Sequence, residues 1–420
     1  MARTVQDLMR FATVGSVDDG KSTLIGRLLV DTRQLFDDQL DAVVQASAKR
    51  GVGDLDLSFV TDGLRAEREQ GITIDVAYRY SSSPSRKFVI ADCPGHVQYT
   101  RNMATGASTA DVALVVIDVA AGLKEQTRRH LCIAALLGVR HVIVAANKMD
   151  TCGWDQEIFE RVAADVRAFS ETVGFHEVLV IPVSALHGDN VVDPSAVAAW
   201  YNGPTVLSAL ENAPLGSRGS ADTGARLPIQ WVLRQNGGGR TYAGMVAGGT
   251  LRPGDTVTLL PQNVTTTLRA IHTLREDLTE AFDSMSVDLD LADETDAGRG
   301  DLIATAPLPR VATEFEATLC WFSDAPLRPG SRWRLKHTTR STPARIESIG
   351  GLLALDSLTS GPADSFANND IGFVTIRTAQ PICIDDYLDN RVTGSFVLVD
   401  EVSNITVAAG MIGRPHFSTL

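Results

Sequence analysis

Apolar runs alternate with helix-like segments along the first half of the chain. The apolar runs lie at 11–14, 87–92, 112–118, 141–147 and 178–183. Runs of this kind are typical of strands that are buried on both faces, as in a parallel sheet covered by helices. Between them, apolar positions at helical spacing predict helices near 98–108, 124–138 and 155–173. The first half of the chain therefore predicts a doubly wound α/β domain with a mostly parallel sheet.

The pattern changes after residue 215. Residues 216–224 are polar and glycine-rich, which is typical of a linker. Beyond them, short strand-like segments alternate with turns such as Arg252–Asp255 and Arg328–Ser331, and this texture is typical of β-barrels. The stretch is long enough for two barrels, with a break near 307–312. The predicted domains are 1–215, 225–308 and 312–420.

The segment after the first apolar run has the sequence of a phosphate-binding loop. Gly15–Ser22 reads GSVDDGKS and fits the P-loop pattern G-x-x-x-x-G-K-[ST], between a strand-like run and a helix-like segment. Its glycines let the backbone wrap a phosphate with N–H groups pointing inward. We expect Lys21 to reach the β- and γ-phosphates and Ser22 to ligate Mg²⁺. Asp18 and Asp19 add negative charge, and we expect them to turn outward or to bind a cation.

A second motif follows the apolar run at 87–92. Asp92-Cys93-Pro94-Gly95 has the form Asp-x-x-Gly at the end of a buried strand. An aspartate at this place can hold Mg²⁺ through a water molecule, and the Gly95 N–H can contact a γ-phosphate. The predicted phosphate-binding residues are Gly15, Ser16, Val17, Asp18, Asp19, Gly20, Lys21, Ser22, Thr23 and Gly95.

Two further segments predict that the base is guanine. Asn147-Lys148-Met149-Asp150 follows a buried strand, and the Asp150 carboxylate can accept hydrogen bonds from guanine N1–H and N2–H₂. Adenine has no donors in that arrangement, so such a site rejects it. Asn147 can brace this loop against the P-loop, and the Lys148 stem can cover the base. Ser184-Ala185-Leu186, after the next strand, is expected to supply a backbone N–H to guanine O6.

Thr73 and His96 are the candidates for sensing the γ-phosphate and for hydrolysis. In GTPases, a threonine between the P-loop and Asp-x-x-Gly ligates Mg²⁺ and keeps a switch loop ordered until hydrolysis, and Thr73 has this position. His96 directly follows Gly95 and is placed to orient the attacking water. The predicted magnesium ligands are Ser22, Thr73 and Asp92, the last through water.

Composition narrows the classes of partner and compartment. The net charge is −13, and residues 276–301 hold ten acidic residues against one basic residue. Nucleic-acid binding normally needs a basic surface, so a nucleic-acid partner is not expected. No apolar run reaches the ~20 residues of a membrane helix, and no membrane partner is expected. The five cysteines are scattered without a C-x-x-C pair, which predicts reduced thiols in a cytoplasmic protein.

These motifs carry a resemblance to a known family. The segments GSVDDGKST, AEREQGITID, DCPGHVQYTRNM and NKMD resemble the translational GTPase superfamily, whose members have a GTP-binding domain and two β-barrels. The Asp-Asp pair in the P-loop, Asp75–Tyr80 and Gln98–Ser108 resemble one branch, the large GTP-binding subunits of bacterial ATP sulfurylase. Cys93 is a departure, because the family usually has threonine there, and we expect this side chain to pack locally.

The resemblance implies a division of labour between two chains. It implies that residues 1–215 bind and hydrolyse GTP with Mg²⁺, and that a small catalytic subunit makes adenosine 5′-phosphosulfate and pyrophosphate from ATP and sulfate. The partners would form a heterodimer or a larger assembly. The sequence has no Ser-Gly-Gly-x-Asp-Ser loop of ATP pyrophosphatases, which agrees with ATP and sulfate sites on a partner. By position, Val17 and Ile72 would flank the attacking water as an apolar gate beside His96.

Two other classes of function stay open on the sequence alone. A translation factor that delivers aminoacyl-tRNA would have the same fold, so the fold does not discriminate between them. The acidic balance of the chain argues against that alternative. A purely regulatory GTPase is the third possibility.

Overall fold

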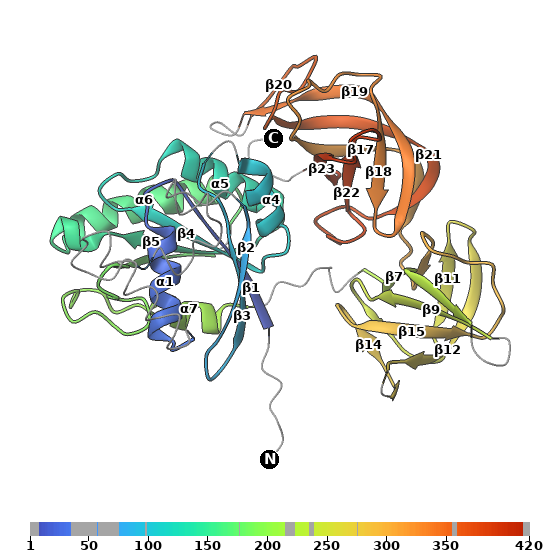
Figure 1. The fold of residues 1–420 in the computed structure, drawn as a ribbon, viewed down its shortest axis with the longest axis horizontal. Helices are drawn as coiled ribbons and strands as arrows, with labels where there is room; N and C mark the ends of the chain where they lie inside the picture. The colour runs from blue at the N-terminus through green and yellow to red at the C-terminus, as the bar shows by residue number, and fades with distance from the viewer. Residues whose placement is uncertain are drawn as a thin grey trace. The chain divides into compact units, whose positions relative to one another are not determined.

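The structure of the chain is a computed structural model that describes residues 8–34, 57, 75–96, 99–175, 177–214, 223–234, 239–274, 276–354 and 359–414. The chain divides into two compact units (Figure 1). Of the described residues, unit 1 contains those from 8 to 214 and unit 2 contains those from 223 to 414. The finer division of unit 2 at residues 308 and 312 stays a prediction.

Unit 1 is built on a six-stranded sheet with the order β2-β3-β1-β4-β5-β6. Its strands are β1 (Leu8–Gly15), β2 (Ala77–Ser82), β3 (Lys87–Asp92), β4 (Val112–Asp118), β5 (His141–Asn147) and β6 (Glu177–Pro182). All neighbouring pairs are parallel except β2 with β3. In register, Thr13 lies opposite Asp92, and Asp118 lies opposite Asn147. The carboxyl ends of the strands that precede the sequence motifs therefore lie side by side at one end of the parallel sheet.

The sequence pattern predicts no strand between the apolar runs at 11–14 and 87–92, but β2 lies there in the chain and pairs with β3 as the edge strand of the sheet. The reason lies in the pattern of Ala77–Ser82, which alternates half-buried and exposed positions instead of forming an apolar run. An edge strand in contact with water does not need the continuous apolar sequence of a central strand.

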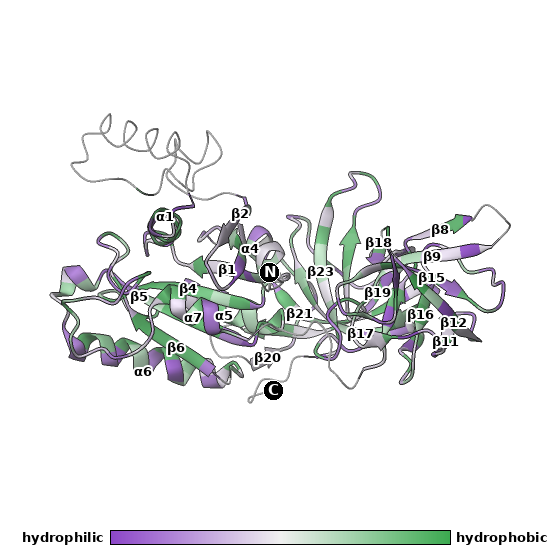
Figure 2. Cartoon of the chain, turned by 90° about the horizontal axis from the view of Figure 1, so that it is seen from below, coloured by the Kyte–Doolittle hydropathy of each residue, from purple (hydrophilic) through white to green (hydrophobic). Residues whose placement is uncertain are grey.

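Helices cover both faces of this sheet. They are α1 (Lys21–Asp31), α4 (Thr100–Ala107), α5 (Glu125–Leu136), α6 (Gln156–Thr172) and α7 (Val206–Asn212), with a short 3₁₀ helix at Met149–Cys152. Apolar residues of α1 and α7 share one buried cluster with the strands. Figure 2 shows α1 and α6 on opposite sides of the sheet, whose strands are mainly hydrophobic. Within the described residues, no helix combines the length and apolar character needed to span a membrane.

The first barrel of unit 2 follows the order β7-β16-β11-β12-β15-β9-β8, with β13 paired to β12. Its strands are β7 (Arg226–Pro228), β8 (Trp231–Arg234), β9 (Arg240–Met245), β11 (Thr256–Leu260), β12 (Val264–His272), β13 (Asp277–Leu278), β15 (Ser286–Leu291) and β16 (Leu302–Ala304). A separate pair joins β10 (Thr250–Leu251) to β14 (Ala281–Phe282). A bridge between Arg226 and Ala247 joins β7 to the segment after β9, which brings the two ends of the sheet together.

The second barrel is a closed ring. Its strands are β17 (Arg310–Trp321), β18 (Arg332–His337), β19 (Arg340–Ala354), β20 (Thr359–Gly361), β21 (Ile371–Ile384), β22 (Ser395–Val399) and β23 (Thr406–Ile412). The ring closes because β18 pairs with both β22 and β19. Closure leaves fewer unpaired strand edges than an open sheet has. The predicted fold class, an α/β domain followed by β-barrels, is confirmed.

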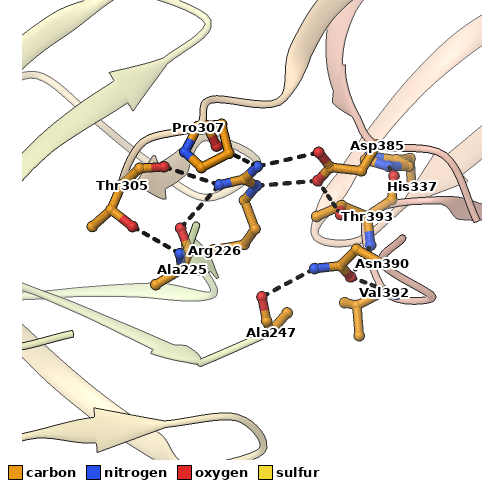
Figure 3. A network of polar contacts seen from close by, with 10 residues as sticks. All are labelled: Ala225, Arg226, Ala247, Thr305, Pro307, His337, Asp385, Asn390, Val392 and Thr393. Carbon is orange, nitrogen blue, oxygen red and sulfur yellow. Dashed lines mark hydrogen bonds and ion pairs between the residues drawn. The ribbon is translucent and has the colours of Figure 1, made fainter. Parts of the chain in front are cut away.

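A buried arginine joins the two barrels of unit 2 (Figure 3). Arg226 is 1% exposed, and its Nε and Nη2 atoms lie 3.1 and 3.2 Å from the Asp385 carboxylate oxygens. The same guanidinium donates to the carbonyl oxygens of Thr305 and Pro307, at 3.0 and 2.7 Å. Thr393 donates its hydroxyl to Asp385 at 2.6 Å. The buried charges are therefore paired and hydrogen-bonded, as burial requires.

A second ion pair joins the barrels, with the arginine on the second barrel and the aspartate on the first. Arg340 of β19 lies 2.6 Å from the Asp301 carboxylate and donates to the Gly300 carbonyl oxygen at 2.9 Å. Asn390 donates to the Ala247 carbonyl oxygen at 3.1 Å. A small apolar cluster between the barrels contains Leu260, Leu302, Ala304 and Cys383. The two barrels thus share an apolar and ionic interface.

Candidate functional site

The P-loop has the backbone that its two glycines were expected to provide. Gly15 and Gly20 have φ angles of +150° and +92°. A Cβ atom on Gly15 would lie 2.4 Å from the Val116 carbonyl oxygen, and one on Gly20 would lie 2.3 Å from Asn147 Nδ2. No side chain fits at either position. The loop therefore leads directly from β1 into α1, with Gly20 preceding the first helical residue, Lys21.

Lys21 is buried beneath this loop. Its Nζ donates to the carbonyl oxygens of Ser16 and Gly15, at 2.7 and 3.1 Å. Burial lowers the pKa of Lys21, while the charges of Asp92 and Asp19 act in the opposite direction. A Cβ atom on Gly95 would lie 2.4 Å from Lys21 Nζ. The Asp-x-x-Gly segment therefore packs directly on the P-loop lysine, as a shared phosphate site requires.

The two acidic residues of this loop lie in different surroundings. Asp18 is exposed, with a φ of +65°, but Asp19 is fully buried and does not turn outward. Its carboxylate accepts a hydrogen bond from the Ser16 N–H at 3.0 Å and forms an ion pair with Lys124 at 2.6 Å. The physical reason is that Lys124, at the start of α5, provides a positive partner inside the fold. Val17, Ser22 and Thr23 are half-buried on the same loop and helix start.

Asn147 connects the phosphate loop to the predicted base site. It is buried, and its Nδ2 donates to the Asp19 carbonyl oxygen at 2.9 Å. Its Oδ1 accepts from the Ala185 N–H, also at 2.9 Å. The structure therefore brings the P-loop, the Asn-Lys-Met-Asp segment and the Ser-Ala-Leu segment together. The Ala185 N–H is engaged by Asn147, whereas no hydrogen bond of the Leu186 N–H is found among the described residues.

The side chains around the base site are held in place by neighbours. The Lys148 ammonium lies 2.8 Å from Asp118 Oδ2, and this ion pair lowers the pKa of Asp118 against the effect of its partial burial. Ser184 donates its hydroxyl to Asp150 Oδ1 at 2.6 Å. The Ser184 hydroxyl therefore holds one oxygen of the Asp150 carboxylate in place. Arg27 of α1 donates to the carbonyl oxygens of Ala185 and Leu186, which holds the Ser-Ala-Leu segment against α1.

Asp92, Cys93 and His96 differ in their surroundings. Asp92 is 1% exposed at the end of β3. Cys93 is fully buried, and a Cβ atom on Gly106 would lie 2.5 Å from its sulfur, so the thiol packs against α4. Burial raises the pKa of this thiol far above its usual range. His96 is exposed, with its ring centroid 6.0 Å from that of Tyr99.

Two predicted residues lie outside the described residues. They are Ile72 of the apolar gate and Thr73, the switch threonine. Val17 is described, but the gate needs both residues. The part of the chain that the structure describes contains no group of three or more His, Cys, Asp or Glu side chains arranged to hold a metal ion.

The residues that support the motif side chains were not among the site residues predicted from the sequence. They are Arg27, Asp118, Lys124 and Thr127. Thr127 lies on the first turn of α5, and its hydroxyl is 3.1 Å from that of Ser16. Asp118 had a detectable signal, because it ends an apolar run that is parallel to the run ending at Asn147. Lys124 had only a weak signal, as a lysine at the first position of the helix predicted at 124–138.

Comparisons with known proteins agree with this architecture. The family described as the elongation factor Tu GTP binding domain matches residues 6–276. The family described as GTP-eEF1A C-terminal domain-like matches residues 314–413, within the second barrel.

Curated relatives match nearly the whole chain. The bifunctional enzyme CysN/CysC of Mycobacterium tuberculosis is 50% identical over 415 residues, which is 97% of this chain and 67% of that protein. Sulfate adenylyltransferase subunit 1 of Laribacter hongkongensis is 48% identical over 411 residues, 97% of this chain and 85% of that protein. The protein of the same name from Aeromonas salmonicida is 46% identical over 414 residues, 98% of this chain and 88% of that protein. The chain belongs to the sulfate adenylyltransferase subunit 1 family and contains a GTP-binding domain of the elongation factor Tu type.

Proposed function

We propose that this chain hydrolyses GTP and that hydrolysis drives the formation of adenosine 5′-phosphosulfate and pyrophosphate from ATP and sulfate on a separate catalytic subunit. One observation carries the proposal: P-loop, Asp-x-x-Gly and Asn-Lys-Met-Asp segments meet at one sheet edge, in a chain about half identical to sulfate adenylyltransferase subunits. The energetic reason is that adenylylation of sulfate is uphill, so a coupled hydrolysis supplies the missing driving force.

The described contacts support specific roles at the nucleotide. Lys21 would exchange its two carbonyl partners for the β- and γ-phosphate oxygens, which are stronger acceptors because they are charged. Gly95, packed on Lys21, would direct its N–H to the γ-phosphate. Asp150 would accept from guanine N1–H and N2–H₂ while Ser184 holds the carboxylate. The Lys148 stem, anchored at Asp118, would cover the base.

The donor set near Lys21 fits Mg²⁺. The Ser22 hydroxyl follows Lys21 in the chain, and the carboxylate of Asp92 is the strongest opposite charge acting on Lys21. Hydroxyl and carboxylate oxygens are the hard ligands that Mg²⁺ prefers, and the ion usually keeps several waters. Ser22 would bind the ion directly, Asp92 through water, and Thr73 would complete the set. The ion would neutralise phosphate charge.

Hydrolysis requires a positioned water beside the γ-phosphate. His96 directly follows Gly95 and is exposed, so it is available to orient that water, with Val17 and Ile72 excluding others. Partner binding would then regulate a slow intrinsic rate, because no described residue of the P-loop or of Asp92–His96 is an arginine that could stabilise transition-state charge.

The proposed setting is a cytoplasmic heterodimer or larger assembly with the catalytic subunit. The five cysteines form no disulfide with one another, and four of them, Cys93, Cys132, Cys320 and Cys383, are buried. Buried thiols without disulfides are compatible with a reducing compartment. The name "subunit 1" of the relatives implies a second subunit in those proteins, and we extend that implication to this chain.

The test is a coupled assay on the complex. The chain is co-expressed with the catalytic subunit encoded in the same organism, and adenosine 5′-phosphosulfate is measured with ATP and sulfate in the presence of GTP, GDP or a non-hydrolysable GTP analogue. We expect substantial product only with GTP. The matched control carries Lys21→Ala, which removes the phosphate contact and should lower product to the level seen with GDP. Equal product with and without GTP would show that the proposal is wrong.

A further inference from the structure

The P-loop of this chain contains a buried negative charge at a place where phosphates are expected to bind. The Asp19 side chain is 1% exposed and lies one residue before Gly20 and two before Lys21. It is held from three sides: its carboxylate by the Ser16 N–H and by Lys124, and its carbonyl oxygen by Asn147. An uncompensated carboxylate here would repel the phosphates of any bound nucleotide.

Lys124 supplies the compensating charge. Its Nζ lies 2.6 Å from Asp19 Oδ1, and the lysine side chain is 36% exposed while the aspartate is closed off from water. The pair is therefore asymmetric. Loss of the lysine leaves a buried anion that solvent cannot screen, whereas the lysine itself can turn into water if the aspartate loses its charge.

The same segment contacts the P-loop a second time. Lys124 directly precedes α5, and Thr127 on the first turn of that helix pairs its hydroxyl with that of Ser16 at 3.1 Å. Residues at the start of α5 therefore contact both the Asp19 carboxylate and the Ser16 hydroxyl of the loop. This contact fixes the loop in one geometry and keeps the lysine beside the aspartate.

We propose that Lys124 is a positioning residue for the nucleotide: by neutralising Asp19 it sets the affinity of the P-loop for guanine-nucleotide phosphates. The inference rests on the proposed function, because it assumes that this loop binds GTP. It adds a residue that belongs to none of the nucleotide-binding motifs. The pair also explains how the loop tolerates an acidic residue next to its phosphate cradle.

The test measures dissociation constants of a fluorescent GDP analogue and a fluorescent GTP analogue for the full chain with Mg²⁺. Lys124→Met should raise both dissociation constants by about tenfold or more. The Asp19 carboxylate would then have no positive partner and would repel the phosphates through a partly buried environment. Asp19→Asn should tighten binding by several-fold, because the Asn oxygen still accepts from the Ser16 N–H while the excess charge becomes positive. The double variant should return to within about threefold of the wild type.

The opposite signs of the two single variants separate this role from a structural one. If the pair only stabilised the loop, both single variants would weaken binding and the double variant would be no better than either. That result would overturn the inference, and so would an unchanged affinity of Lys124→Met. Lys124→Arg should restore binding, and Lys87→Met, which removes an exposed lysine from the same unit, is the matched control with wild-type affinity. A wild-type chain that bound no guanine nucleotide would instead refute the proposed function.

Discussion

At the scale of single residues, the proposed base recognition depends on a carboxylate that a neighbouring side chain holds in place. Ser184 donates to one oxygen of Asp150 at 2.6 Å. The substitution Asp150→Asn keeps an oxygen for Ser184 but replaces an acceptor with an amide donor. We expect GTP affinity to fall by about 10²-fold or more, and xanthosine triphosphate to bind in its place, because xanthine presents an oxygen where guanine presents N2–H₂. Competition binding with both nucleotides measures the exchange.

The control for this prediction is Ser184→Ala. It removes the hydroxyl that orients the carboxylate but leaves both acceptors, so GTP should weaken by less than for Asp150→Asn and without a gain for xanthosine triphosphate. An unchanged preference for GTP in Asp150→Asn would remove this residue from the base site.

The sequence predicts which site residues gather but not how they pair. Lys21, Asp92 and Asn147 each follow or end a buried strand, and parallel strands finish at one edge, so their proximity follows from topology. The ion pair of Asp19 with Lys124 joins residues 105 positions apart. A surface-type lysine has no local pattern that selects one aspartate among many. Only the folded loop shows that Asp19 points inward.

Another residue-scale prediction concerns pH. His130 of α5 is 1% exposed, and burial lowers its pKa to about 3 from the ordinary value of 6.5. Between these values the unfolded chain binds a proton that the folded chain does not. The free energy of unfolding of unit 1 should therefore fall as pH decreases below 6.5, by about 1.4 kcal/mol per pH unit from this group. Above pH 6.5 the contribution is constant.

The measurement is pulse-labelled hydrogen exchange of α5 peptides across a urea series from pH 5 to 7.5. His130→Gln should reduce the slope of stability against pH in that window, whatever its effect at pH 7.5. His187→Gln changes an exposed histidine of the same unit and should leave the slope as it is. Equal slopes for the wild type and His130→Gln would contradict the assignment.

At the scale of elements, apolar runs determined what the sequence could predict. The predicted strands at 87–92, 112–118 and 141–147 coincide with β3, β4 and β5. Strand β2 was not predicted because its residues alternate between exposed and half-buried positions. The interface between the barrels was not predicted either, because Arg226 and Asp385 are 159 residues apart and each resembles a surface charge in the sequence.

That buried pair carries the element-scale prediction. Asp385→Asn leaves the Arg226 guanidinium charged and enclosed, so the free energy of unfolding of unit 2 should fall by about 3–5 kcal/mol. The matched control is Glu280→Gln, whose partner Arg252 is 60% exposed, with an expected cost of about 0–1 kcal/mol. Urea unfolding followed by hydrogen exchange of β16 and β21 peptides measures both. If the two variants lost similar free energies of unfolding, Arg226 and Asp385 would not behave as a buried ion pair.

At the scale of the whole molecule, the structure changes the meaning of the acidic segment 276–301. Several of its carboxylates are partners within the barrels, as Asp301 is for Arg340, Asp277 for His272 and Asp293 for Thr266. These acids therefore have hydrogen-bond or ion-pair partners within unit 2 and also add to the negative field. The net charge of −13, and not that segment alone, disfavours a polyanionic partner.

The charge of the molecule leads to a prediction that separates the proposed function from delivery of aminoacyl-tRNA. In filter binding at physiological salt, the GTP-bound chain should retain no tRNA at protein concentrations up to about 10 μM, because the net charge of −13 opposes the approach of a polyanion. Lowering the salt strengthens any non-specific contact equally with GTP and GDP. Dependence on the nucleotide is therefore the informative readout, since a delivery factor must distinguish the two states. GTP-dependent, submicromolar retention would favour the translational role, whatever the family resemblance of the chain.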